Sequence, residues 1–319
     1  MMQLLLFFIT HCMMIIGLSG LTVEIPAEHT LNGEKVRFSI EIGDSVFKKI
    51  SVYCTDYGGS SLDRDHCAFY AHEVSGHLYG HRYTPSRNNS TVEDFYASRT
   101  DIIQYITQRR KVRKYLEIGC DMDLTFATMK SIDVGVDALI SSQVKHSLDV
   151  SICVDPLRGG THRMTSDEFF QQNNITFDLI FVDGLHEAHQ VMRDVFNGLR
   201  WLKDDGIIVM HDCNPSRYEY QVTPPLNDSD VGIWNGDTWR AAVALRLQDG
   251  LEIVIGDFEH GVGVIRRKLN RHRLPVEWER KLLTKNPIDA LGWEDLDQNR
   301  EVLHRLMTLN EVKKWLDSD

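Results

Sequence analysis

Acidic residues follow two apolar runs in the second half of the chain. Phe177–Val182 is a short, mostly apolar run that stops at Asp183, and Ile207–Met210 is a second run that stops at His211 and Asp212. Short apolar runs of this kind are typical of strands buried on both faces of a sheet. Two adjacent parallel strands would each deliver a carboxylate at the carboxyl end, which is the ligand-binding edge of an open α/β sheet.

A helix is predicted between these two strands. From Ala188 onward, apolar residues recur at helical spacing and form one stripe, at Val191, Val195, Leu199 and Leu202. Asp204-Asp205-Gly206 is expected to end that helix. The alternation of strands and helices continues to about Arg267 and predicts a doubly wound α/β sheet.

The flanks of this core carry patterns of their own. A helix is predicted at Asp101–Gln108 with Thr100 as its N-cap, followed by a strand at Tyr115–Ile118. Leu251–Ile255 and Gly261–Ile265 are separated by too few residues for a crossover helix, so an antiparallel hairpin is expected. Residues 272–319 have a helical pattern. Leu303, Leu306 and Leu309 lie on one stripe, and Asn310 is expected to cap a last short helix.

The length and the net charge of the chain limit the classes of protein to which it can belong. A chain of 319 residues with 42% apolar and 25% charged residues can hold one large α/β domain with appendages. The formal net charge of -11 argues against a nucleic-acid partner, because contacts to phosphates need a basic face.

The first 20 residues have the pattern of a cleaved signal peptide. Leu4–Ile9 and Met13–Ile16 form an apolar core, and Gly17-Leu18-Ser19 offers small residues for cleavage, although no basic residue precedes the core. The alternative is an uncleaved anchor, for which the apolar run is short. Four glycosylation sequons also favour a secreted protein, at Asn88, Asn89, Asn174 and Asn227.

The sequence pattern of residues 21–91 predicts a small β-rich extension followed by a linker. Val36–Ile42 alternates apolar and polar residues, and Ile50–Cys54 is a candidate neighbour strand. Cys54 and Cys67 are predicted to form a disulfide in an oxidising lumen. The later cysteines, at Cys120, Cys153 and Cys213, are expected to be small buried apolar residues. No C-x-x-C spacing exists, which argues against a zinc site.

Several motifs in the core resemble a known family. They are Leu116–Gly119, Val154–Pro156, Gly159–Asp167, Phe181–His186, His211–Pro215 and Trp234–Trp239. Together they resemble class I S-adenosylmethionine-dependent methyltransferases, and within that class the small O-methyltransferases. The resemblance covers roughly residues 100–267. It implies a seven-stranded, mostly parallel Rossmann-like sheet with a late antiparallel hairpin, joined here to the β-rich extension and C-terminal helices.

The resemblance also implies roles for individual residues. Glu117, Gly119 and Asp155 would lie against the methionine part and the ribose of S-adenosylmethionine, and Thr165 and Ser166 would flank its adenine. Asp183 and Asp212 correspond to positions where related enzymes hold a divalent cation such as Mg²⁺, which would activate a hydroxyl of the acceptor. His186 or His211 would then serve as the base.

Plainer interpretations of the same residues stay open. Asp183 can simply end a strand before Gly184, His186 can be an exposed loop histidine, and His211 can be a hydrogen-bonded core residue. The Trp234–Trp239 block fits either a lid over a substrate or packing on the late strands.

The pattern departs from the family on the cofactor side. Asp123 replaces the second glycine of the first motif and adds a carboxylate beside the bound cofactor. The interval from Gly119 to Asp155 is long for the ribose-binding acid and contains a rival at Asp137; Asp155 is preferred because the family signature follows it. S-adenosylmethionine is moreover a cytosolic metabolite, so a lumenal enzyme would depend on its transport.

Two hypotheses from different classes result. The first is a lumenal, metal-assisted O-methyltransferase that acts on a sugar or polyol hydroxyl. The second is a secreted, non-catalytic glycoprotein with the methyltransferase fold, for example in the extracellular matrix. The expected layout is a signal peptide at 1–20, an extension and linker at 21–91, a methyltransferase-like domain at 92–270 and a helical segment at 271–319.

Overall fold

A computed structural model describes two units of the chain, residues 1–82 and residues 83–319. In the first unit it describes only the strands at 5–9, 12–17, 20–25 and 36–41. In the second it describes residues 97–120, 125–126, 129, 148–157, 161–225 and 234–318.

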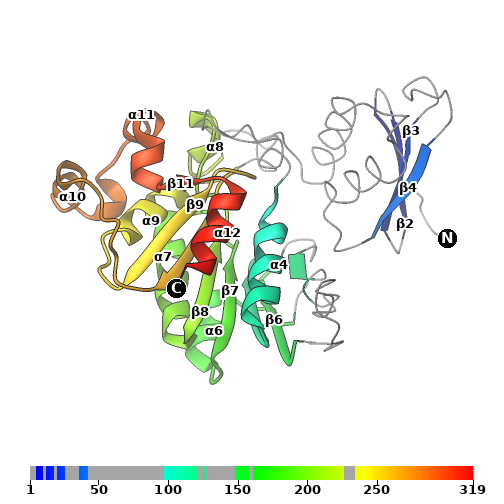
Figure 1. Ribbon diagram of the computed structural model, residues 1–319, viewed down its shortest axis with the longest axis horizontal. Helices are drawn as coiled ribbons and strands as arrows, with labels where there is room; N and C mark the ends of the chain where they lie inside the picture. Colours follow the sequence, from blue (N-terminus) through cyan, green and yellow to red (C-terminus); the bar gives the residue numbers. More distant parts are fainter. Residues whose placement is uncertain are drawn as a thin grey trace. The chain divides into compact units, whose positions relative to one another are not determined.

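The first unit contains a four-stranded antiparallel sheet (Figure 1). Its strands follow one another in sequence order: β1 (Leu5–Ile9), β2 (Cys12–Gly17), β3 (Gly20–Ile25) and β4 (Val36–Glu41). The strand predicted at 36–42 is confirmed by β4. β1 and β2 fall within the predicted signal peptide, whose cleavage stays a prediction. The second predicted strand, at 50–54, and the Cys54–Cys67 disulfide lie outside the described residues.

A seven-stranded mixed sheet forms the centre of the second unit. Its strand order is β11-β9-β10-β8-β7-β5-β6. The parallel part comprises β5 (Lys114–Ile118), β6 (Val150–Val154), β7 (Phe177–Val182) and β8 (Leu202–Met210). The antiparallel hairpin is β9 (Leu251–Gly256) and β10 (Val262–Arg267), and β11 (Leu306–Met307) lies parallel to β9. The doubly wound sheet and the late hairpin are therefore confirmed.

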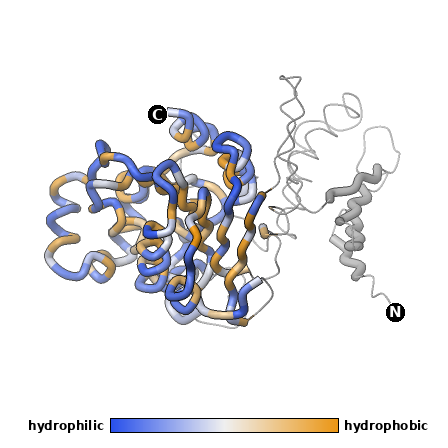
Figure 2. The backbone as a smooth tube through the Cα atoms, turned by 90° about the horizontal axis from the view of Figure 1, so that it is seen from below, coloured by the Kyte–Doolittle hydropathy of each residue, from blue (hydrophilic) through white to orange (hydrophobic). Residues whose placement is uncertain are grey.

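Helices cover both faces of this sheet (Figure 1). α4 (Arg99–Arg110) and α12 (Leu309–Asp317) pack on one face, and α6 (Ser166–Gln172), α7 (Ala188–Trp201) and α9 (Thr238–Leu245) pack on the other. Alternate residues of a strand point to opposite faces. In β7, Leu179 and Phe181 pack in the apolar core under α4 and α12, whereas Ile180 and Val182 pack in the core under α6, α7 and α9. Figure 2 shows apolar residues along the strands.

The C-terminal helices form a smaller apolar cluster around Trp239. They are α10 (Val276–Leu282) and α11 (Trp293–His304); the short 3-10 helix η3 (Pro287–Asp289) between them places Ile288 in the core on the side of α7 and α9. The leucine stripe that was predicted as one helix is interrupted, because Arg305 takes a left-handed conformation and Leu306 then pairs with Ile255 in β11. No helix in residues 97–318, where described, is long and apolar enough to cross a membrane.

Two predicted helix caps are wrong by two residues. Ser98, not Thr100, caps α4, because its hydroxyl accepts from the Asp101 N–H while the Asp101 carboxylate accepts from the Ser98 N–H. Thr308, not Asn310, caps α12 in the same reciprocal way with Glu311. The helix predicted to run to Asp204 ends at Trp201, since β8 begins at Leu202.

Candidate functional site

The carboxyl ends of the parallel strands bring the predicted site residues to one edge of the sheet. Backbone N–H groups directly after the strands continue the ladder: Gly119 donates to Val154, Asp183 to Ile118 and His211 to Val182, at 2.8–3.1 Å. Because these bonds fix the backbone where each strand ends, the side chains that follow converge on one region.

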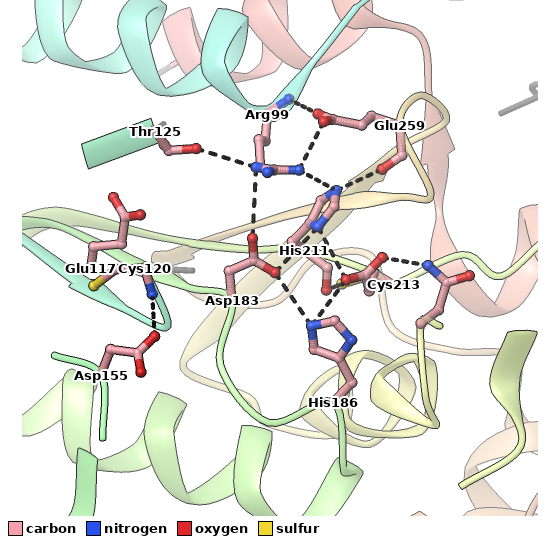
Figure 3. A network of polar contacts seen from close by, with 12 residues as sticks. Arg99, Glu117, Cys120, Thr125, Asp155, Asp183, His186, His211, Cys213 and Glu259 are labelled. Atoms are coloured by element: carbon pink, nitrogen blue, oxygen red, sulfur yellow. Dashed lines mark hydrogen bonds and ion pairs between the residues drawn. The ribbon is translucent and has the colours of Figure 1, made fainter. Parts of the chain in front are cut away.

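Four of the predicted residues meet in what we call the acid–imidazole cluster: Asp183, His186, His211 and Asp212. Figure 3 labels the first three. Nε2 of His186 lies 3.6 Å from Oδ1 of Asp183 and 3.2 Å from Oδ2 of Asp212. Nδ1 of His211 lies 3.3 Å from the same Asp183 oxygen and 3.1 Å from the same Asp212 oxygen. Both imidazoles therefore face the same two carboxylate oxygens.

The other nitrogen of each imidazole contacts a backbone carbonyl. Nδ1 of His186 lies 2.7 Å from the carbonyl oxygen of Trp234, and Nε2 of His211 lies 2.9 Å from that of Glu259. A carbonyl oxygen only accepts, so each of these nitrogens carries a hydrogen. His186 is thus not a free loop histidine, and His211 is both a buried, hydrogen-bonded residue and a member of the cluster.

Mutual attraction shifts the pKa values of the cluster. Burial lowers the pKa of His186, but the charges of Asp212 and Asp183 outweigh burial and raise it to about 9. Burial raises the pKa of Asp212, but the two imidazoles outweigh it and lower the pKa to about 2. The pKa of His211 is raised and that of Asp183 lowered for the same reasons. These values describe imidazolium–carboxylate pairs.

Arg99 and Glu259 complete the site, and neither was identified from the sequence. The Arg99 guanidinium lies over Asp183 (Nε–Oδ2 3.6 Å) and pairs with Glu259 (Nη1–Oε1 2.8 Å) (Figure 3). It also donates to the Thr125 hydroxyl at 3.3 Å. No local pattern marks these residues, because α4 and the β9–β10 turn meet only in the folded chain.

The Trp234–Trp239 block contributes to both the site and the core. Asn235 is buried and donates its side-chain amide to Oδ1 of Asp212, and the Trp234 ring lies 5.3 Å from that of His186. Trp239 is fully buried, which fits packing. A Cβ at Gly236 would lie 1.8 Å from the His186 carbonyl oxygen, so only glycine allows this approach.

The predicted cofactor residues lie beside the cluster. Glu117 is buried at the end of β5 and accepts from the Tyr115 hydroxyl at 2.6 Å. Gly119 has φ +81°, and a Cβ there would lie 2.0 Å from the Asp183 carbonyl oxygen. Asp155 directly follows β6 and accepts from two backbone N–H groups, those of Cys120 and Leu157, at 3.1 and 2.8 Å. Asp123 and Asp137 lie outside the described residues.

Thr165 and Ser166, predicted to flank the adenine, sit at the start of α6. The Thr165 hydroxyl is part of the capping box with Glu168. The buried Ser166 hydroxyl donates to Asp194 of α7 at 2.6 Å. Their adenine role stays a prediction, since both hydroxyls already have partners on the helices.

Cys120 and Cys153 form a disulfide, with a Cα–Cα distance of 6.2 Å. Burial of Cys120, Cys153 and Cys213 is confirmed, but the interpretation of the first two as separate apolar residues is wrong. Adjacent parallel strands explain the pairing, because β6 places Cys153 opposite Glu117 and the chain reaches Cys120 three residues later. The disulfide ties the loop after β5 to β6.

Among the predicted glycosylation sites, Asn174 lies exposed in the loop between α6 and β7. Asn88, Asn89 and Asn227 lie outside the described residues.

Comparisons with known proteins found one matching family and several similar solved structures. The family described as "Methyltransferase domain" matches residues 141–213, which include β6, β7, β8 and all four cluster residues. Similar solved structures include an SAH-bound methyltransferase from Podospora anserina (16% identity, TM-score 0.37, covering 72% of this chain and 98% of that chain). An O-methyltransferase from Bacillus cereus in complex with SAH is also similar (14% identity, TM-score 0.34, covering 69% and 97%).

No curated protein sequence matches the chain. Residues 141–213 are similar to the methyltransferase-domain family, and the described part of residues 97–318 has a Rossmann-like methyltransferase fold with a seven-stranded sheet and a late hairpin.

Proposed function

We propose that this protein is an S-adenosylmethionine-dependent O-methyltransferase of the secretory pathway, assisted by a divalent cation and acting on a sugar or polyol hydroxyl. The observation that carries the proposal is the acid–imidazole cluster, which lies at the carboxyl edge of β7 and β8 directly beside the cofactor-side residues of β5 and β6. An acceptor at the cluster would therefore lie next to a methyl donor at Gly119 and Asp155.

The cofactor side of this edge fits a nucleoside bound through its hydroxyls. Asp155 is held in place by the Cys120 and Leu157 N–H groups, and each carboxylate oxygen keeps acceptor capacity for a ribose hydroxyl. Glu117 is fixed by Tyr115 near the methionine end. The backbone of Gly119 has no Cβ, which allows close approach of a ligand.

The acceptor side fits a divalent cation. Carboxylate oxygens of Asp183 and Asp212 and Nε2 of His186 all lie within 4.8 Å of one another. A cation bound there lowers the pKa of a coordinated hydroxyl. Each imidazole presents one nitrogen to the same two carboxylate oxygens, and a cation bound there would displace the proton from that nitrogen. The half-buried Trp234 ring beside His186 offers the acceptor a flat apolar face.

Three features support the secretory route. They are the apolar N-terminal segment, the exposed sequon at Asn174 and the disulfide between Cys120 and Cys153. Disulfides persist in oxidising compartments and are rare in the cytosol.

One set of contacts favours a second function, that of a secreted non-catalytic glycoprotein. Polar groups that would face the cofactor already have protein partners: Glu117, Asp155, Thr165 and Ser166. If these contacts are not exchanged for contacts to the cofactor, the fold is retained without methyl transfer.

Titration calorimetry of the purified secreted protein with S-adenosylmethionine separates the two functions. The enzyme binds the cofactor, and Asp155→Asn weakens that binding, whereas Asp167→Asn on the half-exposed start of α6 leaves it unchanged. Asp183→Asn keeps cofactor binding and loses turnover. No binding at millimolar S-adenosylmethionine rejects the enzyme and leaves the non-catalytic glycoprotein.

A further inference from the structure

We propose that a basic patch beside the start of β9 and the end of β10 binds a sulfated polysaccharide. The patch consists of Arg246, Lys268, Arg271, His272 and Arg305. Because β10 is antiparallel to both β8 and β9, this edge of the sheet lies opposite the carboxyl ends that carry the acid–imidazole cluster. The proposal therefore goes beyond methyl transfer, and only the choice of a polysaccharide rests on the secretory route of the proposed function.

The sequence after β10 concentrates basic residues in an otherwise acidic chain. Residues 266–273 read RRKLNRHR, whereas the whole chain has a formal net charge of -11. Short segments rich in lysine and arginine are typical of surfaces that bind polyanions. The structure shows which of these side chains are available for such a partner.

Carboxylates near this segment are already paired with arginines outside the patch. Glu252 is buried and pairs with Arg266 (Oε2–Nη2 2.8 Å). Asp249 and Glu279 both pair with Arg273. These three acids therefore leave the charges of the patch without an ion-pair partner.

Lys268, Arg271 and His272 remain at the surface of the segment. Arg271 and His272 are exposed, and Lys268 is half-buried with its ammonium nitrogen 3.2 Å from the Ser318 carbonyl. One carbonyl uses one of three donors, so the ammonium group keeps capacity for another acceptor. Arg267 is not available in this way, because it donates to backbone carbonyls at the start of β8.

Arg246 and Arg305 add two further charges from other elements. Arg246 follows α9, is 5% exposed and donates at 2.8 Å to the carbonyls of Leu303 in α11 and His272 in the patch. Arg305 directly follows α11 and is half-buried, and its Nη1 is buried without a hydrogen-bond partner. The contacts of Arg246 therefore bring the loop after β10 and the end of α11 together.

The positive charges of the patch repel one another. Burial and the charge of Arg305 lower the pKa of Arg246 to about 10. Burial lowers the pKa of His272, and both arginines lower it further, against the attraction of Glu252. In the part of the chain that the structure describes, no ion pair joins a carboxylate to either arginine, or to the lysine and the exposed arginine of the loop. A bound anion would remove the repulsion and give the buried Nη1 an acceptor.

Sulfate esters on a polysaccharide match the patch better than other polyanions do. A guanidinium group donates parallel hydrogen bonds to a tetrahedral oxyanion such as phosphate, and sulfate has the same shape. A nucleic acid that binds as a single strand needs aromatic rings on which its bases stack, and the patch contains none. The disulfide and the exposed sequon favour a compartment that contains sulfated glycans.

Binding of the full chain to immobilised heparin, a highly sulfated polysaccharide, tests the proposal. Surface plasmon resonance should show binding that weakens at least about 10-fold when the heparin is desulfated, and a logarithm of affinity that falls linearly with the logarithm of salt concentration. Single-stranded DNA and vesicles of anionic phospholipid are the comparison ligands. No binding to heparin, equal binding to desulfated heparin, or tighter binding to DNA or vesicles overturns the proposal.

Charge-neutralising variants then locate the binding surface. Arg271→Gln should lower heparin affinity and reduce the slope of the salt dependence by about one, and Arg271→Gln combined with Lys268→Gln should reduce it by about two. Arg163→Gln removes the same charge at an exposed position beyond β6, at the other edge of the sheet, and should bind as the wild type does. Equal losses in Arg271→Gln and Arg163→Gln would show unspecific attraction and refute the patch.

Titration with S-adenosylmethionine separates this proposal from the proposed function. Heparin binding without S-adenosylmethionine binding keeps the basic patch and rejects methyl transfer. S-adenosylmethionine binding without heparin binding rejects the patch and keeps the enzyme. Thermal melts of Arg271→Gln check that the variant is folded, and the comparison of heparin with desulfated heparin on the wild type needs no variant.

Discussion

Arg99 and Glu259 are separated by 160 positions in the sequence, yet their side chains form an ion pair of 2.8 Å. The same carboxylate also accepts from the backbone N–H of Arg99 in the first turn of α4. The Glu259 carbonyl in turn accepts from His211. Glu259 therefore links the start of the domain to the acid–imidazole cluster through both its side chain and its backbone.

Loss of the Glu259 charge should destabilise the protein. Glu259→Gln removes a largely buried charged partner of Arg99, and we expect the free energy of unfolding to fall by about 1–3 kcal/mol. Urea denaturation followed by tryptophan fluorescence measures the change. Glu279→Gln, which breaks the more exposed pair with Arg273, is the control and should cost less than about 1 kcal/mol. Equal losses in both variants would contradict the linking role of Glu259.

Asp194 should make the protein less stable as the pH rises. Burial raises the pKa of this carboxyl to about 6, although Ser166 and Gln190 donate to it. The folded state holds the proton more tightly than the unfolded state, so stability is greatest below about pH 4 and is lost as the pH rises to about 6. Asp194→Asn keeps the acceptor oxygen and should stabilise the protein at pH 7 by about 1–3 kcal/mol. Thermal melts at pH 7 and pH 4 check this, and the gain should vanish at pH 4.

The buried His304 should make the protein less stable as the pH falls. Burial lowers its pKa to about 3, so the unfolded chain binds a proton near pH 6.5 while the folded chain does not. Stability from this group is present above about pH 6.5 and falls by about 2 kcal/mol as the pH drops to 5. His304→Leu should flatten this acid limb in denaturant titrations, whereas His189→Leu at an exposed position should not. An unchanged limb in His304→Leu would assign the acid sensitivity to other groups.

The disulfide should stabilise the loop after β5. Cys153→Ser removes a cross-link between residues 33 positions apart, and we expect the free energy of unfolding to fall by about 2–4 kcal/mol. Peptide mapping without reductant should first recover the Cys120–Cys153 pair. Wild-type protein treated with a dithiol should then match the variant in its melting temperature. A reduced wild type that melts as the oxidised protein does would show that the cross-link does not contribute.

Elements with local signals were predictable from the sequence. β7 is apolar except for Asp178, the final four residues of β8 are a continuous apolar run, and the short gap between β9 and β10 leaves no alternative to a hairpin. Both wrong caps had a local signal too, since Ser98 and Asp101 as well as Thr308 and Glu311 have the spacing of a capping box. A capping-box pair is a stronger signal for a helix start than Thr100 or Asn310 alone.

Long-range contacts were not predictable. Arg99, Glu259 and Asn235 enter the site from α4, the β9–β10 turn and the segment before α9, and no spacing in the sequence relates them to Asp183 or Asp212. The pairing of Cys120 with Cys153 likewise follows from two adjacent strands, because cysteine positions alone do not determine connectivity. β11 is only two residues long and exists through its pairing with β9.

The β9–β10 turn decides how the cluster can be moved to another protein. Glu259, His260 and Gly261 all have positive φ, at 42°, 63° and 89°, so the turn that presents the Glu259 carbonyl to His211 has an uncommon backbone. A graft of residues 141–213 would carry all four cluster side chains but neither carbonyl that orients the two imidazoles. A transplantable unit has to extend from Arg99 through β10, and a chimera that replaces only the family-matched segment would inherit the four cluster side chains without the carbonyls that orient the imidazoles.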